Sequence, residues 1–455
     1  MIANARLAAY RALRAVNSHK SDLPSAIASV RSILTDPRDD ALAFDIVTGT
    51  LRWQAKLDHV ISHVRQRPLI TFDVEVLDIL RISVYQLLHH DRVPAHAIVD
   101  DAVKLTRLAR KSSASGLVNA VLRNIYRKRD RLPIPCMPAN GGREDILNYL
   151  SVALSHPRWL ATRWLNRYGL ERAIAWEKFN DTPAPIVLRV NRRNGTREHL
   201  AASLASHGIQ TKHTCYSPDG LIVTKGNLLQ SPLTKTGAFV VQDEASQLVT
   251  LLATVQPGER VLDTCASPGG KTIALADDMN NDGLLVAADV RRQRLTLLSQ
   301  TLSQNHVSSA SIIRLDLQQG LPFSNNFDCV FVDVPCSGLG VIRRDPEIRW
   351  RRTEADLDRF HKLQTTMLGH AASGVRPGGR LIYGTCSSEP EENEEVIEEF
   401  LRHNPDFNLQ DFRENDQSLS SELNTVFDQK GQLRTSPAEH GLDAFFAARL
   451  VRLSI

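Results

Sequence analysis

The spacing of apolar residues changes twice along the chain, and the first pattern is helical. Over residues 1–132, apolar side chains recur every three or four positions, which is the period of one face of an α-helix. Pro94 interrupts the pattern between two of the helices. The apolar stripes lie at Leu7–Val16, Ala43–Leu51, Val76–Leu88, about 97–110 and about 115–129. The first 132 residues are therefore predicted to form an all-α domain.

A second region follows a stretch that is rich in proline and glycine. Residues 132–142 contain three prolines and a Gly-Gly pair, which is typical of a linker, and we place the linker at 133–145. A small α/β domain is expected at 146–236. Its aromatic and Arg side chains could stack on bases, although packing in a core is their more frequent use. Helices are predicted at 157–168 and 197–207, and strands at 186–190 and 220–224.

From about Val240, short apolar strands alternate with helical segments. Continuous apolar strands of this kind indicate a parallel sheet that is covered by helices on both faces. The expected strands are 260–263, 283–289, 311–315, 327–333 and 379–385. The chain is thus predicted to be multidomain, α plus α/β, and to end in a doubly wound, Rossmann-like domain at 237–455. Ligands of such domains bind at the carboxyl ends of the strands.

Composition excludes several classes of protein. The chain has 455 residues, of which 42% are hydrophobic and 23% charged, as is usual for a globular protein. No apolar run reaches the ~20 residues of a membrane span. The six cysteines form no C-x-x-C pair, which argues against structural zinc and for a reducing compartment. We expect a cytoplasmic monomer without a metal or a membrane partner.

The distribution of charge suggests a polyanionic partner. The net charge is only +4, yet residues 1–132 contain 21 Lys and Arg against 13 Asp and Glu, an excess of eight positive charges. A basic domain attracts phosphate groups, because neutralising them releases counterions. A solvated set of Arg-rich helices would give the same count, so charge alone leaves nucleic-acid binding open.

The first strand of the C-terminal domain runs into a loop of small residues, Asp263–Thr272. Two glycines there allow backbone amides to approach a ligand at the start of a helix. A phosphate-binding P-loop would require Gly where Cys265 stands. A dinucleotide fingerprint is also missing, since Gly338-Leu-Gly340 is followed by Arg343 in place of the last glycine. Both of these nucleotide-binding alternatives are weak.

Three acids follow successive strands, namely Asp263, Asp289 and Asp316. A single acid after a strand is often only a helix cap. Three of them suit a nucleoside that lacks phosphates, because a carboxylate after the second strand binds ribose hydroxyls. S-adenosylmethionine is the predicted cofactor.

Two cysteines and an aspartate follow two further strands. Asp333 and Cys336 come after the fourth strand, and Cys386 comes after the strand at 379–385. Either cysteine alone would most simply be an inert buried thiol. Because neighbouring parallel strands end at the same edge of a sheet, we expect both thiols and the carboxylate to converge there. Such a set suits methylation of cytosine at C5, in which a thiolate adds to C6 and an acid near N3, here Asp333, stabilises the charge.

Several strings resemble known families. Those of the C-terminal half resemble the Nop2/Sun RNA cytosine-5 methyltransferases: VQDEASQ (241–247), VLDTCASPGGKT (261–272), DVPCSG (333–338), GGRLIYGTCS (378–387) and EENE (391–394). Those of the N-terminal part resemble the NusB-type RNA-binding domain: FDIVTGTLR (44–52), LRISVYQL (80–87), PAHAIVDDAV (94–103) and GLVNAVLR (116–123). The two resemblances together span essentially the whole chain.

The resemblance implies a role for each matching residue. Cys386 would be the nucleophile, Cys336 would assist product release, and Asp333 would contact the target base with Lys271 nearby. The residues that would hold S-adenosylmethionine are Cys265, Ala266, Ser267, Pro268, Gly269, Gly270, Lys271, Asp289, Asp316 and Asp333. Ser267 and Val334 depart from the family's A-P-G-G-K and D-A-P-C strings, and neither change puts the activity in much doubt.

The resemblance also implies the substrate. A NusB-like domain in front of this methyltransferase favours RNA of the small ribosomal subunit, by analogy. The same chemistry on transfer RNA remains an alternative, as does a non-catalytic RNA-binding assembly factor. DNA cytosine methyltransferases fit less well, since they take their nucleophile from a P-C string and lack the T-C-S cysteine.

Overall fold

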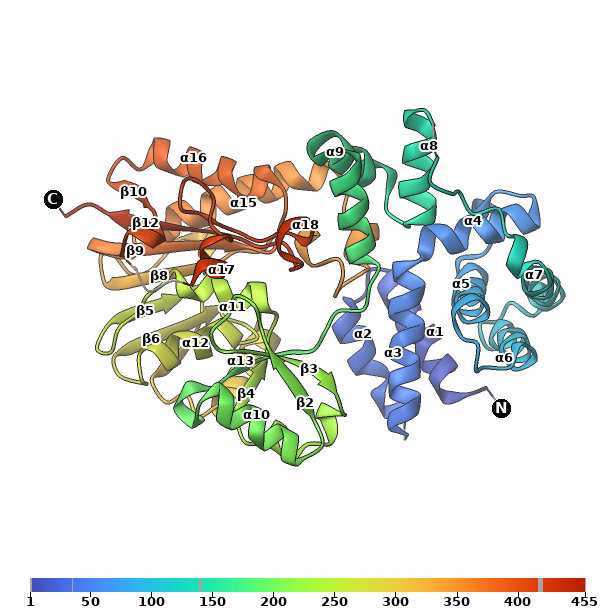
Figure 1. Cartoon of the computed structure of the whole chain (residues 1–455), viewed down its shortest axis with the longest axis horizontal. Helices are drawn as coiled ribbons and strands as arrows, with labels where there is room; N and C mark the ends of the chain where they lie inside the picture. The colour runs from blue at the N-terminus through green and yellow to red at the C-terminus, as the bar shows by residue number, and fades with distance from the viewer. Residues whose placement is uncertain (1, 35, 139–140, 416–419, 455) are drawn as a thin grey trace. The chain divides into compact units, whose positions relative to one another are not determined.

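The computed structural model describes residues 2–34, 36–138, 141–415 and 420–454 (Figure 1). Residues 139–140 of the expected linker lie outside this description. The chain divides into two compact units, Met1–Pro183 with Ile342–Glu354, and Ala184–Val341 with Ala355–Ile455. The predicted fold class is confirmed: a helical N-terminal part is followed by a small sheet and then by a Rossmann-like sheet. None of the helices within the described ranges has the length and apolar character needed to cross a bilayer.

The N-terminal part of the first unit is a helical bundle. Its helices are α1 (Asn4–Asn17), α2 (Leu23–Val30), α3 (Pro37–Arg52), α4 (Gln54–Arg65), α5 (Val74–His89), α6 (Ala95–Leu108) and α7 (Ser115–Arg127). The predicted apolar stripes face inward, and Leu13, Ile46 and Leu80 are completely buried. Asp36 caps the start of α3, where Pro37 suits the first turn. Helical periodicity predicted α1, α3, α5, α6 and α7, each of which buries one stripe, but not α2 or α4.

The first unit also includes α8 (Arg143–Asn148), the extension of the predicted helix at 157–168 to residue 180, and residues 342–354, none of which was predicted. After α8, helix α9 (Arg158–Asn180) continues across a kink at Gly169, whose φ of 76° favours glycine. Residues 342–354, which include α14 (Ile348–Arg351), pack into this unit although they follow Cys336 in the sequence. The buried guanidinium of Arg349 donates to the carbonyl oxygen of Ser155 at 2.9 Å and to the carboxylate of Asp181 at 3.1 Å.

The second unit begins with a small antiparallel sheet of order β2-β3-β1-β4. Its elements are β1 (Val187–Val190), α10 (Arg197–Ser206), β2 (Gln210–His213), β3 (Gly220–Lys225) and β4 (Phe239–Val241). Leu200 and Leu204 of α10 pack on Leu188 and Leu221 of the sheet. The predicted strands β1 and β3 and the helix α10 are present, whereas β2 and β4 were not predicted.

The larger sheet of the second unit contains the strands that the predicted site residues follow. Its order is β10-β12-β9-β8-β5-β6-β7, with β11 paired to β12. Strands β5 to β9 are parallel to one another, and β10 to β12 extend the sheet with antiparallel pairings. The strands are β5 (Arg260–Asp263), β6 (Leu284–Asp289), β7 (Ala310–Arg314), β8 (Phe327–Asp333), β9 (Val375–Thr385), β10 (Phe407–Gln410), β11 (Leu433–Arg434) and β12 (Phe446–Arg452).

Helices cover both faces of this sheet, as a doubly wound fold requires (Figure 1). One face packs against α11, α12 and α13, and the other against α15 and α16. The helices of this unit are α11 (Glu244–Leu251), α12 (Gly270–Asp278), α13 (Arg292–Gln304), α15 (Ala355–Ala372), α16 (Glu394–His403), α17 (Ser421–Asn424) and α18 (Pro437–His440). Burial on both faces explains why the centres of β5 and β8, Val261–Leu262 and Cys329–Val332, are apolar.

Candidate active site

The carboxyl ends of β8 and β9 bring two thiols together. The strands are parallel neighbours, with Asp333 in register with Gly384. The loops that follow them therefore start side by side, and the Sγ atoms of Cys336 and Cys386 lie 3.1 Å apart. Both are free cysteines. The sequence placed these residues 50 positions apart, and the pairing of their strands makes them neighbours.

The two thiols are not equivalent. The hydrogen bond with Cys386 raises the pKa of the Cys336 thiol well above its ordinary value, and burial and the charge of Glu392 add to this effect. Cys336 is thus held as a neutral thiol, whose S–H can be donated to the sulfur of Cys386. A neutral thiol beside a second sulfur is suited to proton transfer, whereas nucleophilic attack requires a thiolate.

A half-buried ion pair lies at the same edge of the sheet. The Nζ atom of Lys271, in the first turn of α12, donates to Oδ2 of Asp333 at 2.7 Å. Burial by itself would lower the pKa of Lys271, but the charge of Asp333 and this hydrogen bond outweigh burial, and the net pKa is raised. A negative charge on Cys386 also raises the pKa of Lys271. The ammonium group therefore remains protonated and can stabilise a thiolate at Cys386.

A cavity of about 280 Å³ opens beside this ion pair. It is lined by Val240, Val241, Gln242, Ser246, Asp263, Cys265, Ala266, Ser267, Pro268, Gly270, Lys271, Thr301 and Asp333. The loop between β5 and α12 forms much of this wall. At its turn, Gly269 has a φ of 114°, and a Cβ there would come within 3.1 Å of the Leu298 side chain, so glycine is required. Lys271 and Asp333 connect the cavity to the cysteine loops.

Asp263, one of the three acids whose positions after successive strands suggest a nucleoside, lines this cavity. Its Oδ2 accepts a hydrogen bond from the Thr272 hydroxyl at 2.6 Å. Its buried Oδ1 makes no hydrogen bond of good geometry with any residue that the structure describes. Burial raises the pKa of Asp263 to about 7; the Thr272 hydrogen bond opposes this shift, and the nearby charge of Asp333 adds to it. A buried oxygen without a partner can accept a donor from a ligand.

Three further residues were predicted at the cofactor site, and their role there stays a prediction. The cavity lining, as far as the described residues form it, does not include Gly269, Asp289 or Asp316. Asp289 is buried at the end of β6, and its Oδ1 accepts from the backbone N–H of Arg291 at 3.1 Å. Oδ1 of Asp316 accepts from the backbone N–H of Gln318 at 3.1 Å, which caps a short 3-10 turn.

A buried carboxylate fastens the two cysteine loops to each other. Oε1 of Glu392 accepts from the backbone N–H of Ser337 at 2.7 Å and from Nε2 of Gln364 at 3.0 Å. Oε2 accepts from the hydroxyl of Ser337 at 2.5 Å and from that of Ser387. Ser337 and Ser387 directly follow the two cysteines. Glu392 belongs to the EENE string of the family resemblance, and the sequence alone does not distinguish this buried Glu from the other acids of the segment.

The remaining cysteines are separate from this site. Cys136 and Cys215 are exposed, and Cys329 is buried in β8 within the apolar core. Throughout residues 2–34, 36–138, 141–415 and 420–454, no group of three or more His, Cys, Asp or Glu side chains is arranged to hold a metal ion.

Comparison with known families finds a match for each of the three predicted domains. The family described as 16S rRNA methyltransferase RsmB/F matches residues 249–451, and the NusB family matches residues 3–127. A ferredoxin-like domain of RsmF/B-like methyltransferases matches residues 156–229.

Similar proteins match over the whole chain. The ribosomal RNA small subunit methyltransferase B of Pseudomonas putida is 35% identical, over 99% of each chain. The crystal structure of the protein PH0851 superimposes with a TM-score of 0.81 at 25% identity and covers 99% of both chains. A methyltransferase homologue from Pyrococcus horikoshii superimposes with a TM-score of 0.58 at 30% identity, over 69% of this chain and all of that one.

Proposed function

Because the chain belongs to the RsmB/F family of 16S rRNA methyltransferases, we propose that it methylates C5 of a cytosine in 16S ribosomal RNA, with S-adenosylmethionine as the donor. Cys386 is the proposed nucleophile and forms a covalent bond to C6 of the base. The observation that carries this proposal is the pair of thiols 3.1 Å apart beside the Lys271–Asp333 ion pair. A methyl transfer to an oxygen or to an exocyclic nitrogen would need neither thiol.

The cavity beside β5 fits the proposed cofactor. Asp263 offers a buried oxygen that lacks a partner, and S-adenosylmethionine carries a sulfonium and an ammonium group that a carboxylate attracts. The loop 265–271 would hold the cofactor through its backbone, with Asp289, Asp316 and Asp333 in the supporting roles that the family resemblance implies. When bound, the cofactor supplies an electrophilic methyl group.

The residues of the site divide the chemistry between them. The Cys386 thiolate, stabilised by Lys271, adds to C6, and the ring electrons move towards C5 while a proton held between Asp333 and Lys271 neutralises N3. C5 then takes the methyl group. In the last step a base removes the C5 proton, N3 returns its proton to the Lys271–Asp333 pair, the C6–sulfur bond breaks, and Cys386 leaves as a thiolate that Cys336 can hydrogen-bond.

The wider organisation is part of the same proposal. Residues 1–132 would bind the RNA, and residues 133–145 would link this domain to the next. Residues 146–236 would guide the RNA, and residues 237–455 would carry out the methylation. The protein would act as a monomer in the cytoplasm without a metal. Incubation with labelled S-adenosylmethionine and separated ribosomal and transfer RNA tests the substrate. Label in 5-methylcytosine of 16S RNA is the expected result, whereas label only in transfer RNA, or none, would contradict it.

Cofactor affinity is expected to depend on pH through Asp263. The pKa of this group is about 7 without a ligand, and a nearby cation lowers the pKa of a carboxyl group, so binding releases a proton. Affinity should therefore rise with pH, by at most about tenfold per unit, up to about pH 7 and then level off. Calorimetric titration of the RNA-free protein with S-adenosylmethionine measures the affinity at each pH. In Asp263→Asn the rise should vanish; the same rise in that variant would assign it to another group.

Loss of the Glu392 carboxylate is expected to slow methylation without weakening cofactor binding. In Glu392→Ala, the Ser337 and Ser387 hydroxyls and the Gln364 amide lose their acceptor, and the cysteine loops lose their common tie. Misplaced reacting groups cost about 10²-fold in rate. Single-turnover methylation compared with cofactor affinity separates the two effects, and Glu392→Gln, which retains one acceptor, should be intermediate. A wild-type rate in Glu392→Ala would show that the loops hold their positions without it.

A further inference from the structure

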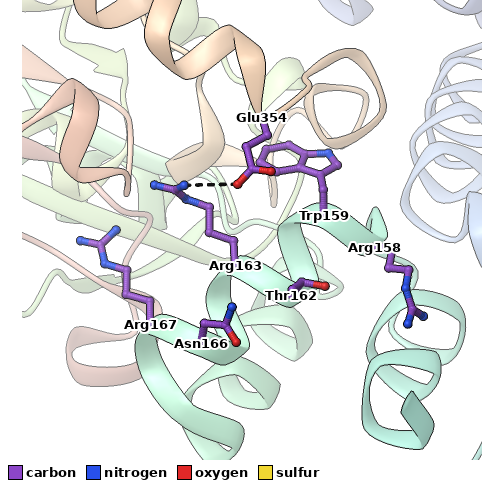
Figure 2. Close-up of a pocket in the computed structure, with 7 residues that line it drawn as sticks. All are labelled: Arg158, Trp159, Thr162, Arg163, Asn166, Arg167 and Glu354. Atoms are coloured by element: carbon purple, nitrogen blue, oxygen red, sulfur yellow. Dashed lines mark ion pairs between the residues drawn. The ribbon is translucent and has the colours of Figure 1, made fainter. Parts of the chain in front are cut away.

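Two of the cavities differ in whether their polar groups already have partners. In the cavity over the first turns of α9, of about 630 Å³, Arg163 pairs with Glu354 at 3.6 Å (Figure 2), and Arg158 pairs with Glu144. Neighbouring carboxylates therefore engage basic groups of that cavity. The cavity beside β5, here called the cofactor cavity, is different, because two side-chain donors on its wall have hydrogens that no described residue accepts.

The other side-chain donors of the cofactor cavity are in use. The hydroxyls of Ser267 and Thr301 donate to backbone carbonyl oxygens at 3.1 Å and 2.9 Å. The ammonium group of Lys271 is engaged by its ion pair in the proposed mechanism. The N–H and O–H donors that this chemistry leaves unused are the side-chain amide of Gln242 and the hydroxyl of Ser246, both of which line the cavity.

Arg189 of β1 fixes the orientation of the Gln242 amide. Arg189 is buried, and its Nε donates to Oε1 of Gln242 at 2.9 Å. A guanidinium group can only donate hydrogen bonds, so the amide oxygen must face it and the amide NH₂ group points the other way. Nε2 of Gln242 donates to Oγ of Ser246 at 3.3 Å. That contact uses one amide hydrogen and leaves the second one, together with the hydrogen of the Ser246 hydroxyl, for a ligand.

The guanidinium group that orients the amide is itself held at two points of α12. It donates to the carbonyl oxygen of Gly270 at 3.2 Å, where the helix begins, and to Oδ2 of Asp277 at 2.9 Å. Oδ1 of Asp277 also accepts from Nε of Arg193 at 2.6 Å. The Gln242 amide is therefore presented by a buried network, and it needs no rearrangement to bind a ligand.

Two neighbouring donors on one wall suit a carboxylate. S-adenosylmethionine carries a carboxylate at its methionine end, next to an ammonium group. The acids of the same cavity, Asp263 and Asp333, attract the ammonium group and repel the carboxylate, so the two groups need different partners. Hydrogen bonds to an ionised acceptor are roughly twice as strong as those between neutral groups. The amide and the hydroxyl thus supply what the acids of the cavity cannot.

We propose that the Gln242 amide and the Ser246 hydroxyl hold the carboxylate of S-adenosylmethionine, an inference that rests on the proposed function. Gln242 lies between β4 and α11, and Ser246 lies in the first turn of α11, so both belong to the string at 241–247. Arg189 comes from the small antiparallel sheet. Through Arg189, that sheet takes part in binding the cofactor.

Binding of two ligands without RNA tests the assignment. Decarboxylated S-adenosylmethionine retains the sulfonium and ammonium groups and lacks only the carboxylate. Calorimetry of the full-length protein should find that the wild type binds S-adenosylmethionine about tenfold more tightly than the decarboxylated ligand, because the wild type makes hydrogen bonds to a charged group. Ser246→Ala should weaken binding of S-adenosylmethionine several-fold, to the extent of about one hydrogen bond, and leave the decarboxylated ligand unaffected.

Gln242→Glu is the sharper variant. The new carboxylate still accepts from Arg189, so the buried network keeps its acceptor, but an oxygen replaces the NH₂ group and repels the carboxylate of the ligand. Affinity for S-adenosylmethionine should fall by about 100-fold, and affinity for the decarboxylated ligand should be retained or increased. The order of the two affinities should therefore reverse, which a general loss of structure would not produce.

Thr301→Val is the matched control, since it removes a hydroxyl of the cavity wall whose hydrogen is donated to its own helix. It should keep the wild-type ratio of the two affinities. Equal weakening of both ligands in Gln242→Glu would overturn the assignment, and so would an unchanged ratio, which would leave the carboxylate to the backbone amides of the loop 265–271. A wild-type protein that binds neither ligand would contradict the proposed cofactor itself.

Discussion

Cys386→Ala is expected to abolish methylation and to leave the affinity for S-adenosylmethionine close to that of the wild type. The variant removes the only atom proposed to attack C6, and C5 of cytosine is too weak a nucleophile to accept a methyl group without that attack. Removing a covalent nucleophile costs an enzyme about 10⁴-fold or more in turnover. The residues that line the cofactor cavity do not include Cys386, so cofactor binding provides an independent readout. Transfer of labelled methyl groups to 16S RNA measures the methylation rate, and calorimetry measures the affinity for S-adenosylmethionine.

Cys215→Ala is the matched control for this experiment. Cys215 is an exposed cysteine of the same unit, so its removal changes the thiol count without touching the cysteine loops. It should retain the wild-type rate. Substantial turnover in Cys386→Ala would place the nucleophile elsewhere, and loss of cofactor binding in that variant would point to a structural defect.

Cys336→Ala is expected to trap the protein on its RNA. The variant retains the nucleophile and the Lys271–Asp333 pair, so attack on C6 and methyl transfer can proceed. It lacks the neutral thiol that lies 3.1 Å from Cys386, whose raised pKa keeps a proton available as the C6–sulfur bond breaks. The covalent adduct should therefore accumulate, as a band that survives denaturation and disappears on treatment with ribonuclease.

The double variant Cys336→Ala/Cys386→Ala should give no such band. This control distinguishes a bond to Cys386 from crosslinking at another residue. Normal product release by Cys336→Ala, with no accumulated adduct, would show that elimination does not need this thiol.

Much of the fold follows from local pattern. β5 and β8 were predicted to the residue, because each has a buried apolar centre, Val261–Leu262 and Cys329–Val332, that is followed by an aspartate. In the N-terminal bundle, α1, α3, α5, α6 and α7 followed from their 3.6-residue period, whereas α2 and α4 were not predicted. The strands β10, β11 and β12 were not predicted, although β12 completes the sheet beside β9. Their pairing partners are far away in sequence, and no local period encodes such a pairing.

Residues 342–354 illustrate the same limit. In the sequence, Arg349 and Trp350 have polar groups and read as part of a surface segment. Their position along the chain does not indicate that they pack with the helical unit. The indole N–H of Trp350 donates to the carbonyl oxygen of Leu51 at 2.6 Å. A buried guanidinium is stable only where several acceptors surround it, and those acceptors come from other segments of the chain.

For the site, the sequence by itself determined which side chains follow which strands: Asp333, Cys336, Cys386 and the glycine loop at 265–271. Only the tertiary structure decided their mutual geometry, from the contact between two sulfur atoms to the buried oxygen of Asp263 and the carboxylate of Glu392 that joins two loops. The physical reason is that strand ends are specified by local hydrophobic pattern, whereas hydrogen bonds and pKa shifts depend on what surrounds a group in space. That environment is created by residues distant in the chain.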